Sequence, residues 1–282
     1  MAKLNKIYTK NADWQKLIVL GTNRNKRHRH GEFLVEGVRN INGAIANNWE
    51  IASVIYCPQS LKSDWAYKVI ADAKADVLHE LSPELMAELS GKEDTSELMM
   101  TVKMRHAKTL PAPTDHAPLY LLYDRPSNRG NLGTVIRSCD GFGADGLIIC
   151  GHGVDPYDPE TIVSTMGSFF SFPFMRAEDA NGVDAVIADL KSQYPDLRII
   201  GTTSHAQTPI YALNLKSPTL IILGNETDGM SAHLTEICTT LTTIPMSPKS
   251  SASSFNAACA ATTMLYEVTR QRKGIFLEKN SP

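Results

Sequence analysis

Three loops of this 282-residue chain hold the polar side chains whose types and spacing could support chemistry. They span residues 124–133, 224–231 and 245–254, and each follows a short apolar run and precedes a helical pattern. Apolar runs that alternate with helices predict a parallel β-sheet, in which the loops after the strands lie along one edge and gather ligands there. We therefore expect the three loops to converge on one site.

The first loop leads into a helix expected at 134–142, and two residues of this region are candidates. Asn131 is placed to cap the helix N-terminus, and Arg137 follows about two helical turns or less behind it. Both could therefore border one cleft, although Arg137 and Asp140 could also form an ordinary surface ion pair. The loop lacks the third glycine of a dinucleotide-binding motif, which gives such a site little support.

The other two loops offer an acid and a run of hydroxyl groups. Glu226 lies between Gly224 and Gly229 and could accept hydrogen bonds from a ligand, or could act as a capping acid near a helix. The serines of the third loop lead to a helix expected from 255 to about 272, where free amides suit a polar ligand; we expect one serine to be the cap. Asn256 would lie one residue inside this helix and disfavour it, which favours a role for its side chain.

The sequence lacks the motifs of a nucleophilic or zinc-dependent mechanism. It contains no G-x-S-x-G and no H-E-x-x-H, and the three loops contain no cysteine or histidine. The remaining groups suit transfer of an already activated group, in which positioning does most of the catalysis. The five widely spaced cysteines form no C-x-x-C, which predicts reduced thiols rather than disulfides or a metal site.

Length and composition predict a soluble α/β protein of two domains. Hydrophobic residues make up 43% of the chain and charged residues 21%, both ordinary values. No apolar run approaches the ~20 residues that span a bilayer, and the first residues lack the apolar segment of a secretory signal, so we expect a cytoplasmic protein. We expect a first domain at 1–105, a proline-rich linker at 106–118 and a second domain at 119–282.

Positive charge is concentrated near the N-terminus. Residues 1–40 contain nine lysines and arginines but three acids, whereas the whole chain has a net charge of −2. This asymmetry indicates a localised contact with nucleic acid. The densest part is a basic loop at 23–30, which predicts phosphate binding, although a solvated surface loop has the same pattern. The candidate RNA-binding residues are Arg24, Lys26, Arg27 and Arg29.

Together the three loops resemble the motifs of the TrmH-like RNA 2′-O-ribose methyltransferases of the SPOUT class. The first family motif, N-x-x-x-x-x-R, matches Asn131 and Arg137, and the second, G-x-E-x-x-G, matches Gly224, Glu226 and Gly229. The third motif, I-P-M and then S-L-N after a serine-rich loop, matches Ile244-Pro245-Met246 and Ser254-Phe255-Asn256. The resemblance covers 119–272, and the front domain is similar, more loosely, to a ribosomal-protein-like RNA-binding domain.

The resemblance implies a parallel-sheet SPOUT domain with a deep trefoil knot, preceded by a small α/β RNA-binding domain. It also implies a homodimer formed through the knot region, without a metal. Arg137 would activate the ribose 2′-hydroxyl as a base or stabilise the developing alkoxide. Asn131, Glu226, Ser254 and Asn256 would shape the site. S-adenosylmethionine would contact Leu223, Gly224, Asn225, Gly229, Ile244, Met246 and Ser254.

The function that the resemblance implies is methyl transfer from S-adenosylmethionine to a ribose 2′-hydroxyl of structured RNA, with rRNA favoured over tRNA. Two alternatives stay open, a catalytically silent RNA-binding or ribosome-assembly factor on this fold and a base-methylating SPOUT enzyme. Three positions depart from the family pattern and bear on substrate choice. Ser247-Pro248-Lys249 stands where a glycine is usual, Phe255 replaces a leucine, and Val163 replaces a frequent arginine.

Overall fold

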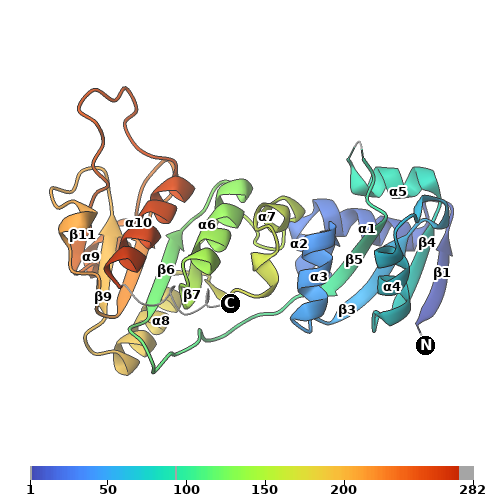
Figure 1. The fold of residues 1–282 in the computed structure, drawn as a ribbon, viewed down its shortest axis with the longest axis horizontal. Coiled ribbons are helices and arrows are strands. Elements are labelled where there is room, and N and C mark those ends of the chain that lie inside the picture. The colour runs from blue at the N-terminus through green and yellow to red at the C-terminus, as the bar shows by residue number, and fades with distance from the viewer. Residues whose placement is uncertain (1, 93, 273–282) are drawn as a thin grey trace, which may run out of the picture. The chain divides into compact units, whose positions relative to one another are not determined.

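The computed structural model describes residues 2–92 and 94–272, which form two compact units (Figure 1). The first unit contains the chain up to Arg105 together with Asp155–Ser171. The second contains His106–Val154 and the described chain from Phe172 onward. The segment Asp155–Ser171 therefore packs with the first unit, although the sequence analysis assigned it to a continuous second domain at 119–282.

The first unit is built on a five-stranded mixed sheet. Its strands are β1 (Lys3–Ile7), β2 (Glu32–Glu36), β3 (Ile51–Tyr56), β4 (Val77–Leu81) and β5 (Leu98–Lys103). Its helices are α1 (Ala12–Thr22), α2 (Arg24–His30), α3 (Val38–Ala46), α4 (Asp64–Asp72), α5 (Pro83–Ser90) and α7 (Pro159–Ser164). The strand order is β1-β4-β3-β5-β2, with β5 antiparallel to both of its neighbours and the other pairs parallel. The predicted α/β character of this part of the chain is confirmed.

The basic segment at 23–30 is a helix, so its prediction as a loop was wrong. The Asn23 side chain accepts a hydrogen bond from the Lys26 amide at 3.0 Å and begins α2. Gly31 ends the helix in the left-handed conformation, with φ +62°. The sequence contains both capping residues, Asn23 and Gly31. The segment between them has no apolar periodicity, which is the pattern from which helices are predicted.

Aromatic rings join Asp155–Ser171 to the sheet of the first unit. The ring of Phe33 on β2 lies 4.9 Å from that of Tyr157 and 5.6 Å from that of Phe169, measured between centroids. Trp49 donates its indole N–H to the carbonyl oxygen of Phe170 at 2.9 Å. Edge-to-face and tilted pairs at these distances add to the stability from burial. This cluster explains why a segment remote in the sequence belongs to this unit.

The second unit contains a six-stranded sheet in which every pair of neighbours is parallel. The order is β11-β9-β10-β6-β7-β8. The strands are β6 (Leu119–Asp124), β7 (Gly146–Cys150), β8 (Phe174–Ala177), β9 (Arg198–Thr202), β10 (Thr219–Leu223) and β11 (Thr240–Thr242). The helices are α6 (Arg129–Gly141), α8 (Ala180–Gln193), α9 (Ala232–Ile237) and α10 (Ala257–Gln271). The predicted parallel sheet is confirmed.

Strand register aligns the loops that follow β6 and β10. Tyr123 of β6 pairs with Leu223 of β10, so the two strands end at the same level of the sheet. The loop that connects β11 to α10 projects from the domain near the start of α10 (Figure 1). The sheet thus positions all three candidate loops in the second unit.

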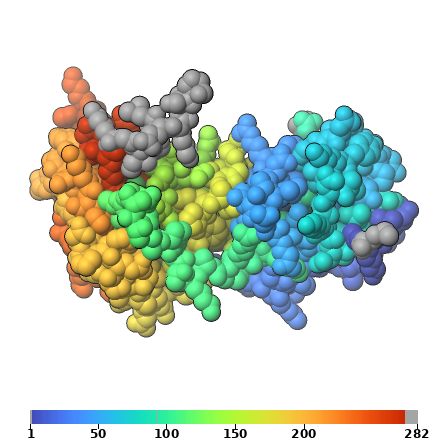
Figure 2. Space-filling model, turned by 60° about the horizontal axis from the view of Figure 1, so that its bottom comes forward, coloured from blue at the N-terminus to red at the C-terminus, as the bar shows by residue number. Residues whose placement is uncertain are grey.

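The proline-rich segment 106–118 lies against the second unit. The carbonyl oxygen of Pro111 accepts a hydrogen bond from the Tyr120 hydroxyl at 2.6 Å, and that of Pro113 accepts one from the Tyr194 hydroxyl at 2.8 Å. In the space-filling view, green atoms of this part of the chain lie along the surface (Figure 2). The segment predicted to be a linker is therefore held in place by two side chains.

Helix α10 packs along α6, and Figure 1 draws the two side by side. The hydroxyl groups of Ser138 and Thr262 lie 2.7 Å apart across this contact. Ala257, Ala258 and Ala261 of α10 are buried. Their small side chains allow another backbone to approach that of α10 closely. None of the described helices is long and apolar enough to cross a membrane.

Candidate active site

A cavity of about 500 Å³ lies within the second unit, where β9, β10 and β11 end. Its walls come from the loops after these strands and from the beginning of α10. The structure brings together every residue for which the sequence analysis expected cofactor contact. These seven lining residues are Leu223, Gly224, Asn225, Gly229, Ile244, Met246 and Ser254.

The loop after β10 is a closed turn that only glycine permits at its first position. A Cβ added to Gly224 would lie 2.5 Å from the Met230 nitrogen and 2.6 Å from the Gly229 carbonyl carbon. Asn225 and Gly229 exchange two backbone hydrogen bonds of 3.0 Å, and Gly229 has φ +71°. The cavity wall at this point is therefore backbone, which can approach a ligand closely.

Beside the cavity, the Glu226 carboxylate accepts four hydrogen bonds from other residues. Its Oε1 accepts from the Tyr123 hydroxyl at 2.5 Å and from Asn131 Nδ2 at 3.2 Å. Its Oε2 accepts from the backbone N–H of Ser127 at 3.0 Å and from the Ser127 hydroxyl at 2.7 Å. Burial alone would raise the pKa of Glu226, but these hydrogen bonds outweigh it and lower the pKa to about 2. The side chain is therefore a carboxylate at neutral pH.

Asn256 connects this network of hydrogen bonds to α10 and is the cap of that helix. Its Oδ1 accepts from the amides of Ala258 at 2.9 Å and Cys259 at 3.3 Å, so the expectation that a serine caps the helix was wrong. Its Nδ2 donates to Asn131 Oδ1 at 3.0 Å. Because the helix amides can only donate, the capping oxygen fixes the orientation of the Asn256 amide. Asn131 must then accept from Asn256 and donate to Glu226.

Asn131 lies inside the first turn of α6 rather than at its cap. The cap is Asn128, whose Oδ1 accepts from the Asn131 amide at 2.8 Å. The expectation that Asn131 caps the helix was therefore wrong. The reason is that the helix begins at Arg129, before the apolar positions from which its start was predicted. Relieved of capping, the Asn131 side chain is available for the site.

Arg137 stands apart from the hydrogen-bonded network. Its side chain is exposed on α6 and, among the described residues, forms no hydrogen bond or ion pair, with Asp140 or any other group. Ser254 lines the cavity but does not enter the network of Glu226. The structure thus joins three of the five candidate catalytic residues, Asn131, Glu226 and Asn256.

Four residues at the end of β6 were not predicted as parts of the site. Tyr123 and Ser127 hold Glu226, as described above. Asp124 is buried and accepts two hydrogen bonds of 3.0 Å from Arg125 and one of 2.8 Å from the Ser231 amide. Arg125 has φ +45° and donates to the Gly229 carbonyl at 3.1 Å. The only signal in the sequence was a charged pair at the end of a buried strand.

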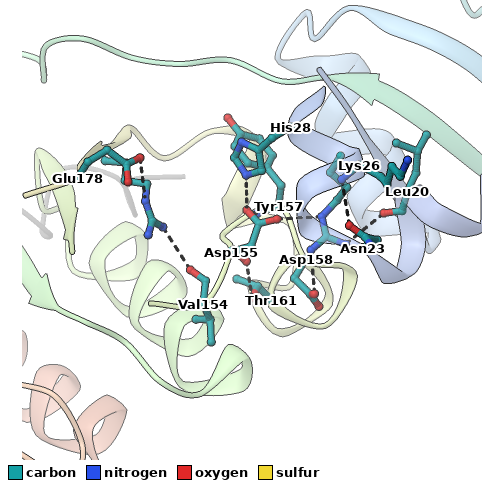
Figure 3. Close-up of polar contacts among 12 residues, drawn as sticks. Leu20, Asn23, Lys26, His28, Val154, Asp155, Tyr157, Asp158, Thr161 and Glu178 are labelled. Atoms are coloured by element: carbon teal, nitrogen blue, oxygen red, sulfur yellow. Dashed lines mark hydrogen bonds and ion pairs between the residues drawn. The ribbon is translucent and has the colours of Figure 1, made fainter. Parts of the chain in front are cut away.

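Only part of the predicted RNA-binding set lies on the surface of α2. Lys26 and Arg29 are exposed, and Arg24 is partly exposed. Arg27 is 1% exposed and forms ion pairs with Asp155 at 2.9 Å and Asp158 at 3.1 Å. Figure 3 shows both carboxylates turned toward α2. The Nε2 atom of His28 lies 3.3 Å from Oδ1 of Asp155. The prediction that Arg27 binds phosphate was wrong, because its guanidinium is paired with the buried carboxylate of Asp155 and the half-buried one of Asp158.

Known proteins resemble this chain over nearly its whole length. The SpoU rRNA Methylase family matches residues 118–266, and the SpoU L30e-like domain matches residues 11–100. A 23S rRNA (uridine(2479)-2′-O)-methyltransferase from Streptomyces viridochromogenes is 37% identical over 268 residues, which cover 95% of this chain and 92% of that protein.

Solved structures agree with this relationship. The SpoU methyltransferase AviRb from Streptomyces viridochromogenes, crystallised with the cofactor AdoMet, has a TM-score of 0.86 and 39% identity, covering 93% of this chain and 98% of that one. An RNA 2′-O ribose methyltransferase has a TM-score of 0.76 and 28% identity, covering 95% and 99%. The described fold, both units included, is that of these proteins.

Proposed function

Because the chain belongs to the SpoU rRNA methylase family, we propose that it transfers a methyl group from S-adenosylmethionine to a ribose 2′-hydroxyl of 23S rRNA. Membership of this family makes the chain an S-adenosylmethionine-dependent RNA methyltransferase. The finer assignment to 23S rRNA is supported by the activity named for the relative of 37% identity. It is also supported by the match of the first unit to the SpoU L30e-like domain.

The observation that carries the proposal is the cavity and the network beside it. A volume of about 500 Å³ falls in the usual range for a small-molecule site. Apolar side chains of Leu223, Ile244 and Met246 suit a nucleoside, and the backbone around Gly224 offers close polar contacts. The lining residues therefore fit S-adenosylmethionine, which supplies an electrophilic methyl group when bound.

The chain's own residues would position the ribose and stabilise its oxygen. An arginine carries five N–H donors and no acceptor, so Arg137 suits a phosphate or a developing alkoxide better than the role of base. Glu226, with a pKa of about 2, is a weak base near neutral pH. We assign Glu226, Asn131 and Asn256 to shaping the site, and Ser254 to its cavity wall.

RNA would be held mainly by the first unit. The exposed Lys26 and Arg29 on α2 are placed to contact phosphates, which position RNA without reading its sequence. We further propose that the protein acts in the cytoplasm as a homodimer formed through the region of α6 and α10, with a trefoil knot that holds the cofactor.

The test is methyl transfer by the purified full-length protein. Labelled S-adenosylmethionine is offered with 23S rRNA, with assembled large subunits and with tRNA, and the product is digested to nucleosides. A labelled 2′-O-methyl nucleoside from 23S rRNA supports the proposal, whereas label in tRNA or on a base contradicts it. If there is neither label nor cofactor binding by calorimetry, the silent RNA-binding alternative is favoured.

Arg137→Ala separates the chemical step from cofactor binding. We expect it to abolish methyl transfer while the calorimetric affinity for S-adenosylmethionine is retained, because Arg137 does not line the cavity. Arg137→Lys is the matched control, since it retains the charge but loses the planar fork of donors. Near-normal turnover by Arg137→Ala would exclude its assigned role.

A further inference from the structure

We infer that Tyr123 and Ser127 are positioning residues for methyl transfer, which act on Asn131 through Glu226. The inference rests on the proposed function, because it concerns the same site. It goes beyond the candidate residues identified from the sequence, which include neither Tyr123 nor Ser127. Neither residue lines the cavity, so neither is a catalytic group itself.

Each oxygen of Glu226 receives two donors, and Tyr123 and Ser127 supply three of the four. Tyr123 donates to Oε1, while Ser127 donates to Oε2 through both its backbone N–H and its hydroxyl. The fourth donor is Asn131. The plane of the carboxylate is thus set by the chain itself. Asn131 then meets an acceptor of fixed position and fixed charge.

The Tyr123 hydroxyl is a donor whose position is fixed by burial and strand pairing. Its ring is fully buried at the end of β6, and the strand pairs directly with β10, which leads into the loop of Glu226. Burial, followed by the hydrogen bond to Glu226, raises the pKa of the Tyr123 hydroxyl above its ordinary value. The hydroxyl therefore stays protonated and keeps donating throughout the pH range of the enzyme.

The fixed carboxylate completes a chain of hydrogen bonds with a single direction. At one end the amides of α10 force Asn256 to present its NH₂ group to Asn131. At the other end Glu226 can only accept. The Asn131 amide consequently has one favourable orientation, in which its oxygen faces Asn256 and its nitrogen faces Glu226. Loss of the two donors of Ser127 and the one of Tyr123 would loosen the acceptor end and let this amide rotate.

The experiment compares Tyr123→Phe, Ser127→Ala and the double variant with Tyr120→Phe. Tyr120 is a matched control because it is also a fully buried tyrosine of β6, but its hydroxyl donates to the Pro111 carbonyl, away from Glu226. We expect Tyr123→Phe to lower kcat about tenfold, the loss of one hydrogen bond to a charged group. The KM for S-adenosylmethionine should stay within about twofold. Tyr120→Phe should retain kcat.

A second readout does not depend on activity. The ¹³C shift of the Glu226 carboxyl, followed by NMR with labelled glutamate, reports its protonation. We expect its midpoint, about 2 in the wild type, to move to higher pH in Tyr123→Phe and further in the double variant. The acid limb of the pH profile of kcat should move in the same direction, and Tyr120→Phe should move neither.

The outcomes separate this inference from the proposed function. An unmoved Glu226 midpoint in the double variant would overturn the inference, as would a kcat for Tyr123→Phe equal to that for Tyr120→Phe. A fall in kcat shared equally by both phenylalanine variants would also overturn it, since the loss would then reflect packing of β6. If the wild type methylates no RNA, the proposed function fails. The shift of the Glu226 midpoint still tests whether Tyr123 and Ser127 hold the Glu226 carboxylate.

Discussion

Arg27 donates from its Nε to Asp155 Oδ2 across 2.9 Å, and both side chains are almost completely buried although 128 positions separate them. The same guanidinium pairs with Asp158 and donates to the carbonyl oxygen of Leu20 at 3.2 Å. A buried cation whose donors are satisfied by carboxylates and carbonyls serves the structure. The contact ties Asp155–Ser171 to the first unit.

Arg27→Ala should destabilise the first unit by about 3–5 kcal/mol, because it leaves two carboxylates without their buried partner. Tryptophan fluorescence during urea unfolding is the measurement, since Trp14, Trp49 and Trp65 all lie in this unit. Arg29→Ala is the control on the same helix, an exposed position where the change should stay within about 0.5 kcal/mol. Equal stability of the two variants would contradict the structural role of Arg27.

The pairing of Arg27 with Asp155 joins two parts of the fold that the sequence did not predict, helix α2 and the place of Asp155–Ser171 in the first unit. Buried parallel strands are continuous apolar runs, so β6 and β10 were predicted as the apolar runs before the loops at 124–133 and 224–231. Helix α2 was not, because its residues are almost all basic and its formation depends on the caps at Asn23 and Gly31. The assignment of Asp155–Ser171 to the first unit rests on contacts across more than a hundred positions, which no local pattern encodes.

Part of the candidate site could be predicted from a motif, and the rest of it depends on packing. Asn131, Glu226 and Asn256 were identified by spacing that matches a family, and the structure joins them. Tyr123 looked like one more apolar residue of a buried strand. Its role appears only when the register of β6 with β10 brings its hydroxyl to Glu226. Periodicity alone cannot supply that register.

Gly224→Ala should abolish or strongly weaken binding of S-adenosylmethionine. The added Cβ would lie within 2.6 Å of backbone atoms of Gly229 and Met230, so the turn that forms the cavity wall must open. We expect the calorimetric Kd to rise by about tenfold or more. Gly141→Ala at the end of α6 is the control, since nothing lies within 4 Å of its added Cβ. Unchanged affinity in Gly224→Ala would exclude this turn from the cofactor site.

Asn256→Asp should separate the two functions of this residue. An aspartate retains the oxygen that caps α10, so stability should remain near that of the wild type. It cannot donate to Asn131, and its negative charge would turn the Asn131 amide, whose oxygen then opposes Glu226. We expect kcat to fall while thermal unfolding is nearly unchanged.

Asn256→Ala completes this comparison, because it removes the cap as well and should cost about 1 kcal/mol of stability. Both variants are measured by thermal unfolding and by methyl transfer under the same conditions. Full activity in Asn256→Asp would show that the hydrogen bond from Asn256 to Asn131, 3.0 Å in the structure, does not contribute to the reaction.

Glu226 should make the second unit more stable above about pH 4.5 than in acid. Its pKa is about 2 in the folded protein against an ordinary 4.5, so ionisation favours the folded state. That contribution is fully present above pH 4.5 and is lost as the pH falls toward 2. Glu226→Gln cannot ionise, and its single NH₂ group must face either the two donors of Ser127 or the donors of Tyr123 and Asn131, a penalty that does not vary with pH. The difference in unfolding free energy between wild type and variant should therefore be constant near neutral pH and shrink in acid.

Hydrogen exchange of amides in β6 and α6 measures this difference in unfolding free energy for the second unit. A difference that stays constant across the acid range would mean that the pKa of Glu226 is the same in the folded and unfolded chain, contrary to the four hydrogen bonds that hold its carboxylate.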